Sequence, residues 1–323
     1  MALEILVTLP ADEAHRRMIE EAAPSAHFTY MEEKNCTDSE MIRGADIILG
    51  NVPPKLIGGS PRLRWIQLGS AGTNGYTDSG VLPEGALLTN ATGAYGLAIA
   101  EHMLGMLLML FKKLDIYHAN QEKQLWHMEG KVRSLAGAKV VVVGLGDIGG
   151  EFAKRVKALG GYVIGVRRAD ARKPEYADEL VLAERLDEVL PVADVVAVCL
   201  PGTEHTRNLI NRERIGLMKK DAVLMNVGRG FVVDTEALCD ALESGSLGGA
   251  CLDVTEPEPL PAGHRLWTAP HTLITPHAAG HFHLQETYER VIRIAVDNLG
   301  RYLRGEKLKN LVDFQTGYRA EKG

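Results

Sequence analysis

Residues 138–168 read AKVVVVGLGDIGGEFAKRVKALGGYVIGVRR and hold the most informative pattern of the chain. Four valines lead into Gly144, Gly146 and Gly149, and an amphipathic segment and a second apolar run follow. This is the G-x-G-x-x-G pattern between a buried strand and a helix. The first glycine permits a tight turn, the second lets the backbone approach a pyrophosphate, and the third lets the helix pack on the strand. The segment therefore predicts dinucleotide binding at the N-terminus of a helix.

The segment after the glycines has the spacing of an amphipathic helix. Its apolar residues expected to face the sheet are Ile148, Phe152, Val156 and Leu159. Glycine turns also connect strands to helices without binding a ligand, so the glycine pattern alone is a weak signal. The two flanking strands and the helix favour the dinucleotide interpretation.

The composition of the 323 residues is that of an ordinary globular protein, with 46% hydrophobic and 24% charged residues. A net charge of −6 indicates no basic surface for nucleic acid. The four cysteines form no C-x-x-C pair, which indicates thiols in a reducing compartment, and the histidines form no metal-binding tract. We therefore expect neither a metal nor a nucleic acid as a partner.

Two apolar segments bear on membranes. Met1 leads directly into a strand-like segment, so no signal peptide is expected. Residues 97–111 form the most apolar segment, but they include Glu101 and His102 and are too short to span a bilayer. They are expected to form a buried helix, either in a core or at a domain or subunit contact. We expect a cytoplasmic protein that does not bind membranes.

Short apolar runs alternate with helical patterns along the chain, which predicts α/β architecture with parallel sheets and helices on both faces. Strands are expected near residues 3–8, 27–31, 46–49, 65–68, 86–89, 139–143, 162–166, 179–183, 195–200, 222–227, 250–254 and 272–275. Two long helices are expected at about 96–124 and 284–304.

The two long helices bracket the dinucleotide segment, which predicts a discontinuous arrangement of two doubly wound domains. Residues 98–284 are expected to form a Rossmann NAD(P)-binding domain. Residues 1–97 and 285–323 are expected to form a flavodoxin-like substrate domain. A cleft between two such domains is the default place for an active site.

Three of the expected strands run into a polar residue that can take part in catalysis, and these residues are Arg229, Glu258 and His277. Ligands of an open parallel sheet bind beyond the carboxyl ends of its strands, so the topology places all three near the dinucleotide. Taken singly, a strand-end arginine or a Pro-His pair is more often a surface residue or a turn. Their joint placement favours catalysis.

The three side chains suit the reduction of a 2-oxo acid. A guanidinium grips a carboxylate in bidentate fashion and polarises the adjacent carbonyl. Hydride transfer to the carbonyl carbon leaves an alkoxide that needs a proton, which His277 can supply because imidazole titrates near neutral pH. A carboxylate on the other ring nitrogen would fix the tautomer and favour the protonated ring. Glu258 is the candidate, and Glu256 in the same loop is the alternative.

Several ordered motifs resemble the D-isomer-specific 2-hydroxyacid dehydrogenases, a family that includes glyoxylate/hydroxypyruvate reductases and D-lactate dehydrogenases. The resemblance extends over most of the chain and rests on residues 144–149 (GLGDIG), 200–206 (LPGTEHT), 226–230 (NVGRG), 252–254 (LDV), 258–261 (EPLP) and 275–280 (TPHAAG). It implies that Arg229, Glu258 and His277 are the catalytic residues, and its spacing favours Glu258 over Glu256.

The resemblance also implies which residues bind ligands. The backbone N–H groups of Ala71 and Gly72 would bind the substrate, together with Arg229 and His277. The carboxylate of Asp253 would accept a hydrogen bond from the nicotinamide carboxamide. The residues expected to bind the cofactor are Gly144, Gly146, Asp147, Ile148, Gly149, Arg167, Arg168, Leu200, Pro201, Thr206, Val227, Gly228, Arg229, Asp253, His277 and Gly280.

The end of the second strand bears on the choice of cofactor. An acidic residue there would recognise the 2′-hydroxyl of NAD, but Arg167 and Arg168 occupy this end, and the next acidic residue is Asp170. Two guanidiniums suit the 2′-phosphate of NADP, so NADP is the expected cofactor. The alternative is a pair of surface arginines beside a pocket that tolerates NAD.

The predicted activity is NAD(P)H-dependent reduction of a small 2-oxo acid, such as glyoxylate or hydroxypyruvate, by a homodimer. One alternative is a formate or phosphite dehydrogenase, although formate dehydrogenases carry Gln where Glu258 stands. Another is a nicotinamide-sensing binding protein, similar to corepressors of this fold. The side-chain pocket could include Tyr76, Tyr95, Met103, Trp126 and His281, whereas His281 and His283 together are more typical of an exposed turn.

Overall fold

The computed structural model describes residues 2–37, 39–168 and 172–314. Its internal contacts divide the chain into two compact units. Unit 1 comprises Met1–Tyr95 and Phe282–Gly323, and unit 2 comprises Gly96–His281. Each unit is built around one sheet whose strand pairs are all parallel. The predicted α/β fold with two parallel-sheet domains is therefore confirmed.

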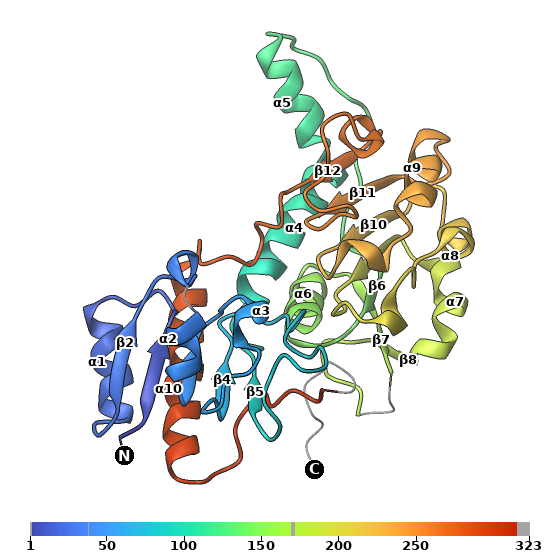
Figure 1. The fold of residues 1–323 in the computed structure, drawn as a ribbon. Coiled ribbons are helices and arrows are strands. Elements are labelled where there is room, and N and C mark those ends of the chain that lie inside the picture. Colours follow the sequence, from blue (N-terminus) through green and yellow to red (C-terminus); the bar gives the residue numbers. More distant parts are fainter. Residues whose placement is uncertain (1, 38, 169–171, 315–323) are drawn as a thin grey trace. The chain divides into compact units, whose positions relative to one another are not determined.

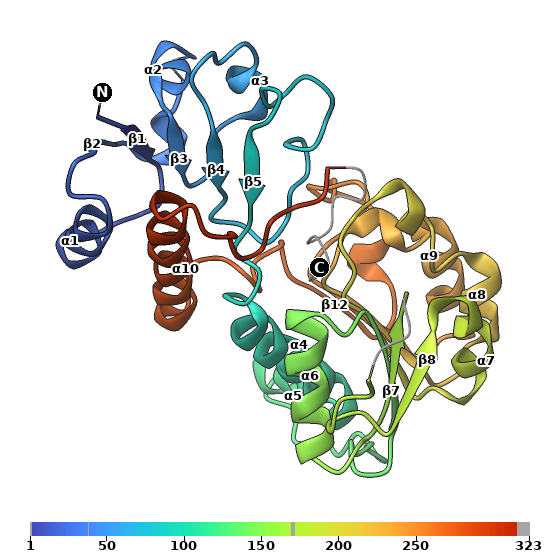
Figure 2. The ribbon, with the colours of Figure 1, turned by 90° about the horizontal axis from the view of Figure 1, so that it is seen from below.

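The sheet of unit 1 has the strand order β2-β1-β3-β4-β5, which is the flavodoxin-like order. Its strands are β1 (Glu4–Val7), β2 (His27–Tyr30), β3 (Ile47–Leu49), β4 (Trp65–Gln67) and β5 (Leu87–Thr89). Its helices are α1 (Glu13–Ala22), α2 (Ser39–Gly44), α3 (Pro54–Ile57) and α10 (Gln285–Leu303), with a short turn of 3-10 helix at Glu33–Asn35. Figure 2 shows α1 and α10 on one face of this sheet and α2 and α3 on the other.

The C-terminal part of the chain returns to this first sheet. The side-chain amide of Asn298 on α10 donates a hydrogen bond of 2.8 Å to the buried side chain of Gln67 on β4. Beyond the helix, Leu311 forms an antiparallel bridge with Thr89 of β5. These contacts join the two separate stretches of unit 1 into one folded body.

The sheet of unit 2 has the order β12-β11-β10-β9-β6-β7-β8. Its strands are β6 (Lys139–Val143), β7 (Tyr162–Arg167), β8 (Glu179–Leu182), β9 (Val195–Val198), β10 (Val223–Asn226), β11 (Gly249–Leu252) and β12 (Thr272–Ile274). The first three strands run outward from β6 in one direction and the later four in the other, which is the Rossmann arrangement. The order reverses between β6 and β9, and the glycine loop follows β6 at this switch point.

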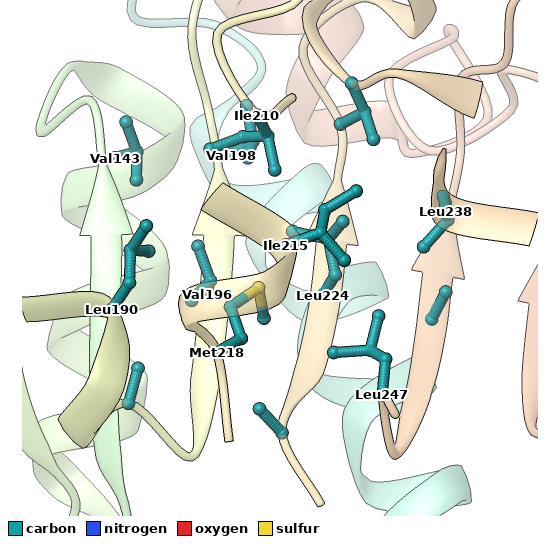
Figure 3. Packing of buried hydrophobic residues seen from close by; sticks show 14 of the residues in the cluster. Val143, Leu190, Val196, Val198, Ile210, Ile215, Met218, Leu224, Leu238 and Leu247 are labelled. Atoms are coloured by element: carbon teal, nitrogen blue, oxygen red, sulfur yellow. The ribbon is translucent and has the colours of Figure 1, made fainter. Parts of the chain in front are cut away.

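Helices cover both faces of the second sheet (Figure 2). The helices of unit 2 are α4 (Gly96–Lys112), α5 (Leu114–Glu122), α6 (Asp147–Ala158), α7 (Leu186–Val189), α8 (Arg212–Leu217) and α9 (Thr235–Glu243), with 3-10 turns at Ala183–Arg185, Leu190–Val192, Glu204–Thr206, Gly230–Val232 and Arg265–Thr268. Figure 3 shows Ile215 and Met218, at α8, packed over Val196 and Leu224 of the central strands. The packing of this buried apolar layer holds the central strands, and therefore their ends, in place.

The prediction of one continuous helix over residues 96–124 is wrong, because this segment forms two helices, α4 and α5. Lys113 adopts a left-handed backbone conformation with φ of 58°, which interrupts the helical hydrogen-bond ladder between α4 and α5. The side-chain amines of Lys112 and Lys113 donate to the backbone carbonyls of Arg133 and Glu129. These long-range bonds hold the break, after which α5 extends away from the sheet (Figure 1).

The apolar face of α4 belongs to unit 2 itself. Its fully or largely buried residues include Ile99, Met103, Met106, Leu107 and Phe111. No helix of the described residues has the length and apolar character needed to cross a membrane.

On α6, Phe152 and Val156 are buried as expected, whereas Leu159 is 45% exposed. Leu159 caps the C-terminus of the helix instead of facing the sheet, so the expected burial of this residue is corrected.

Candidate active site

The three glycines of the glycine loop differ in the room that they leave for a side chain. Gly144 has φ of 97°, a conformation that strongly favours glycine. A Cβ atom at Gly149 would lie 2.0 Å from the carbonyl oxygen of Gly144, so α6 can approach β6 only with glycine there. A Cβ atom at Gly146 would meet no described protein atom within 4 Å. The outer side of Gly146 thus fits a phosphate group approaching the N-terminus of α6.

The first residue of α6 makes a contact that the motif does not reveal. The carboxylate of Asp147 accepts a hydrogen bond of 2.9 Å from the backbone N–H of Gly96, the first residue of α4. A cofactor contact of Asp147 would accordingly use its backbone N–H, which lies at the start of α6 with that of the half-buried Ile148.

The end of β7 carries the two arginines expected to select the cofactor. The half-buried Arg167 donates from Nη2 to the carbonyl oxygen of Leu145, at 3.2 Å, inside the glycine loop. Arg168 follows it and is exposed. Asp170 lies outside the described residues. The guanidinium group of Arg167 thus lies beside the glycine turn, and Arg168 is the next residue along the chain.

The loop after β9 is stabilised from within by threonines. The backbone N–H of Thr203 donates to Oγ1 of Thr206 at 2.9 Å, and Oγ1 of Thr206 donates to the carbonyl oxygen of Pro201 at 3.0 Å. The buried side chain of Thr206 is therefore used inside the turn, where it shapes the backbone around Leu200 and Pro201.

The turn after β10 that presents Arg229 depends on Asn226, which was not among the predicted site residues. The amide of Asn226 donates to the backbone carbonyl of Arg229 at 2.9 Å, and its oxygen accepts from the N–H of Gly228 at 3.0 Å. Asn226 is almost completely buried at the end of its strand. The sequence feature that could have identified Asn226 is a polar residue in the last position of a buried strand. Val227, between these groups, is also buried.

Close packing on both sides fixes the backbone of Arg229. A Cβ atom at Gly228 would lie 2.2 Å from the carbonyl oxygen of Leu200, and one at Gly230 would lie 1.9 Å from that of Thr255. Burial lowers the pKa of the Arg229 guanidinium, and the negative charge of Glu258 acts in the opposite direction. The group remains charged, because arginine is not deprotonated in proteins. A partly buried cation near Glu258 is a suitable partner for an anion.

His277 and Glu258 form a hydrogen-bonded pair in unit 2. The Nδ1 atom of His277 lies 2.6 Å from the Oε1 atom of Glu258, and both side chains are about 40% exposed. Glu256 is exposed, and its backbone carbonyl accepts from the hydroxyl of Thr235. Of the two candidate carboxylates, Glu258 is the one that pairs with the imidazole. The ring of His281 lies 6.3 Å from that of His277, centroid to centroid.

Asp253 holds the loop that carries His277. Asp253 is 3% exposed, and its Oδ1 accepts from the Thr275 hydroxyl at 2.6 Å and from the N–H groups of Ala278 and Ala279 at 2.9 and 3.2 Å. The N–H of His277 donates to the Asp253 carbonyl at 2.8 Å. Gly280, which is half-buried, follows Ala279 at the end of the loop that these bonds hold. Asp253 thus has a structural task besides the predicted contact with a carboxamide.

Ala71 and Gly72 lie in unit 1, in the loop that follows β4. The carbonyl of Ala71 accepts from the Asn90 amide at 2.9 Å, and that of Gly72 accepts from the Ser70 hydroxyl at 2.8 Å. Asn51 donates to Ser70 in turn, at 3.2 Å. These bonds to the carbonyls fix the orientation of the peptide groups in the loop.

The residues suggested for the side-chain pocket have different positions. Tyr76 donates to the carbonyl of Val52, and Tyr95 donates to that of Gly69. Met103 is fully buried in α4, whereas Trp126 is fully exposed. Met103 is therefore a core residue of unit 2. Among the described residues, no group of three or more His, Cys, Asp or Glu side chains could hold a metal ion.

Comparison with known proteins identifies the family. A sequence model of the D-isomer specific 2-hydroxyacid dehydrogenase NAD binding domain matches residues 104–279. A glyoxylate reductase of Aeropyrum pernix is 32% identical over 267 residues, which cover 80% of this chain and 78% of that protein.

Two solved structures are similar over nearly the whole chain. A D-isomer specific 2-hydroxyacid dehydrogenase of Xanthobacter autotrophicus in complex with NADPH and MES has a TM-score of 0.83, with 27% identity over 98% of this chain and 100% of that one. A D-lactate dehydrogenase of Aquifex aeolicus with NAD and lactic acid has a TM-score of 0.76, with 25% identity over 96% of this chain and 98% of that one. The chain therefore belongs to the D-isomer-specific 2-hydroxyacid dehydrogenases, a family of NAD(P)-dependent oxidoreductases.

Proposed function

We propose that this protein reduces a small 2-oxo acid of the glyoxylate or hydroxypyruvate type to the D-2-hydroxy acid, with NADPH preferred over NADH. The observation that carries the proposal is the pairing of His277 with Glu258 at 2.6 Å, in the unit that also contains Arg229 and the glycine loop. The glyoxylate reductase among the relatives supports this substrate class.

His277 is the proposed acid and base. Glu258 accepts the hydrogen of Nδ1, so Nε2 is the nitrogen that presents a proton to the substrate oxygen. NADPH, held at the glycine loop, would supply the hydride that reduces the carbonyl carbon and leaves an alkoxide. His277 then donates its Nε2 proton to the alkoxide, and the charge of Glu258 stabilises the imidazolium until that transfer. In the oxidation direction, neutral His277 accepts the hydroxyl proton.

Arg229 is the proposed carboxylate clamp. Its backbone is fixed by Asn226 and by the close packing of Gly228 and Gly230, so the guanidinium starts from a defined position. A bidentate pair with the substrate carboxylate would orient the 2-oxo group and polarise it. Ala71 and Gly72 remain predicted donors of backbone N–H groups to the substrate.

The preference for NADPH rests on Arg167 and Arg168 at the end of β7. Their positive charges suit a 2′-phosphate, which NAD lacks. Related structures bind either cofactor, so the preference has to be measured. Arg168→Ala is expected to raise the KM for NADPH about tenfold and to leave that for NADH nearly unchanged, because a lost charge contact is worth about 1.4 kcal/mol. Arg185→Ala, on the exposed surface after β8, is the matched control.

We also propose a homodimer that works in the cytoplasm. Large apolar side chains on α5 and the following segment are exposed, and they are Leu114, Leu125, Trp126, Met128 and Val132. Several large apolar side chains exposed on neighbouring segments favour a protein contact. Light scattering would show a dimer that Met128→Lys weakens. The four free cysteines agree with a reducing compartment.

A steady-state screen tests the function. It compares glyoxylate, hydroxypyruvate, pyruvate, bulkier 2-oxo acids and formate, each with NADPH and with NADH. The proposal expects the highest kcat/KM for a small 2-oxo acid with NADPH. Saturable binding of cofactor without turnover of any 2-oxo acid would instead favour a sensor protein, and turnover of formate would favour a formate dehydrogenase.

A further inference from the structure

We infer that His102, on α4, is a positioning residue for His277 and acts through Thr275 and Asp253; this inference rests on the proposed function. Three side chains form a hydrogen-bonded series inside unit 2. Nε2 of His102 lies 3.0 Å from Oγ1 of Thr275, and Oγ1 of Thr275 lies 2.6 Å from Oδ1 of Asp253. His102 is partly buried, and neither His102 nor Thr275 was assigned a role in the reaction.

The proton arrangement in this series follows from its chemistry. Oδ1 of Asp253 already accepts hydrogen bonds from the N–H groups of Ala278 and Ala279, so it acts as an acceptor. A threonine hydroxyl has one proton to donate, and that of Thr275 goes to Asp253. Oγ1 of Thr275 must therefore accept from His102. The structure thus assigns a hydrogen to Nε2 of His102.

The far end of the series controls the backbone at His277. His277 has φ of 52°, a left-handed conformation that few residues other than glycine adopt. Its own N–H bonds to the carbonyl of Asp253, and the next two N–H groups bond to the Asp253 carboxylate. Rotation of that carboxylate would release the peptide groups that hold His277 in this conformation.

Thr275 and His102 prevent that rotation. Asp253 is buried, and the Thr275 hydroxyl donates to Oδ1, the oxygen that also accepts from the N–H groups of Ala278 and Ala279. His102 in turn fixes the orientation of the Thr275 hydroxyl. Its Nε2–H donates to a lone pair of Oγ1, so the hydroxyl proton points toward Asp253. Loss of either donor is expected to displace His277 without removing any group that contacts the substrate.

Two matched pairs of variants test the inference. His102→Leu and Thr275→Val remove the donor at similar volume, whereas His102→Gln and Thr275→Ser keep a donor in nearly the same place. The first pair is expected to lower kcat and kcat/KM for the 2-oxo acid about tenfold, with KM nearly unchanged, because positioning for the transition state is lost. The second pair is expected to retain most of the activity. Melting temperatures are expected to shift by less than about 4 °C.

Several results would overturn the inference. A Leu or Val variant that keeps full kcat contradicts it, and so does a loss that is equal in the Gln or Ser variant. If His102→Leu does not fold, the Thr275→Val and Thr275→Ser comparison decides alone, since a valine replaces the hydroxyl by a methyl group.

A measurement without substrate separates this inference from the proposed function. Nitrogen chemical shifts of isotope-labelled histidine, assigned to His102 with the His102→Gln variant, report which ring nitrogen carries hydrogen. Hydrogen on Nε2 is expected, and a neutral ring with hydrogen on Nδ1 alone would refute the series even in an active enzyme. A wild-type protein that turns over no 2-oxo acid but shows hydrogen on Nε2 would refute the function and leave the hydrogen-bonded series intact.

Discussion

The carboxylate of Glu258 lies 2.6 Å from Nδ1 of His277, although the two residues are separated by a strand and its connection. The loop after β11 brings Glu258 to the imidazole, and the loop after β12 brings the imidazole to Glu258. Adjacent parallel strands end at the same edge of a sheet, so this meeting follows from the topology.

Glu258→Gln is expected to lower kcat by about 10- to 100-fold, because a neutral amide can orient His277 but cannot stabilise its positive charge. Steady-state kinetics with the best 2-oxo acid measure the effect. Glu256→Gln, two residues away in the same loop, serves as the control and is expected to retain wild-type kcat. Equal losses in both variants would contradict the specific pairing.

Arg229→Lys is expected to raise KM for the 2-oxo acid and to lower kcat, each about tenfold, because an ammonium cannot form a bidentate pair with a carboxylate. The KM for the cofactor should change less. Arg212→Lys, at an exposed ion pair with Asp240, is the matched control. Unchanged kinetics in Arg229→Lys would rule out the carboxylate clamp.

Gly146→Ala and Gly149→Ala are expected to fail in different ways. A methyl group at Gly146 meets no described atom within 4 Å, so the protein should fold normally but bind NADPH about tenfold more weakly. A methyl group at Gly149 would collide with the backbone of Gly144, which is expected to lower the free energy of unfolding by about 1 to 3 kcal/mol. Fluorescence titration with NADPH and urea unfolding separate the two effects. Normal cofactor affinity in Gly146→Ala would argue against a pyrophosphate beside this residue.

Much of this arrangement could be predicted from local signals. Apolar runs predicted the strands, and the polar segments that follow three of them indicated Arg229, His277 and a glutamate, which the family resemblance identified as Glu258. The break at Lys113 could not be predicted, because lysine favours helices and the acceptors that hold it lie in residues 129–133.

The residues that orient the catalytic side chains, such as Asn226, Thr275 and His102, could not be predicted, because their contacts also involve groups that only the fold brings together. Asn226 and Thr275 stand inside recognisable motifs, but their tasks depend on which backbone groups come near them in the fold. His102 lies 173 residues from Thr275 in the sequence, so only the folded chain brings the two together. The exposure of Trp126 likewise depends on the path of α5.

A buried carboxylate in unit 1 predicts a pH-dependent stability. Burial acts to raise the pKa of Asp46, but hydrogen bonds from Arg62 and from the N–H of Glu4 outweigh it and hold this pKa below its usual range. The charged form therefore stabilises the fold above about pH 4, and this contribution is lost as the pH falls through the folded-state pKa.

Asp46→Asn should accordingly lower the free energy of unfolding by about 1 to 2 kcal/mol at neutral pH. The difference from wild type should shrink as the pH falls below about 4, because the unfolded chain binds a proton at Asp46 first and the folded protein binds one at lower pH. Urea unfolding of wild type and Asp46→Asn at neutral pH and below about pH 4 measures the difference in the free energy of unfolding. Glu84→Gln, at an exposed residue, is the control. A difference that grows on acidification would contradict the assigned sign.

The most direct test of the central claim is kcat for 2-oxo acid reduction in His277→Ala, measured beside the Kd for NADPH. If His277 supplies the proton, kcat falls by about 100-fold or more while the Kd changes little. A His277→Ala enzyme that reduces glyoxylate or hydroxypyruvate at the wild-type rate would contradict the account.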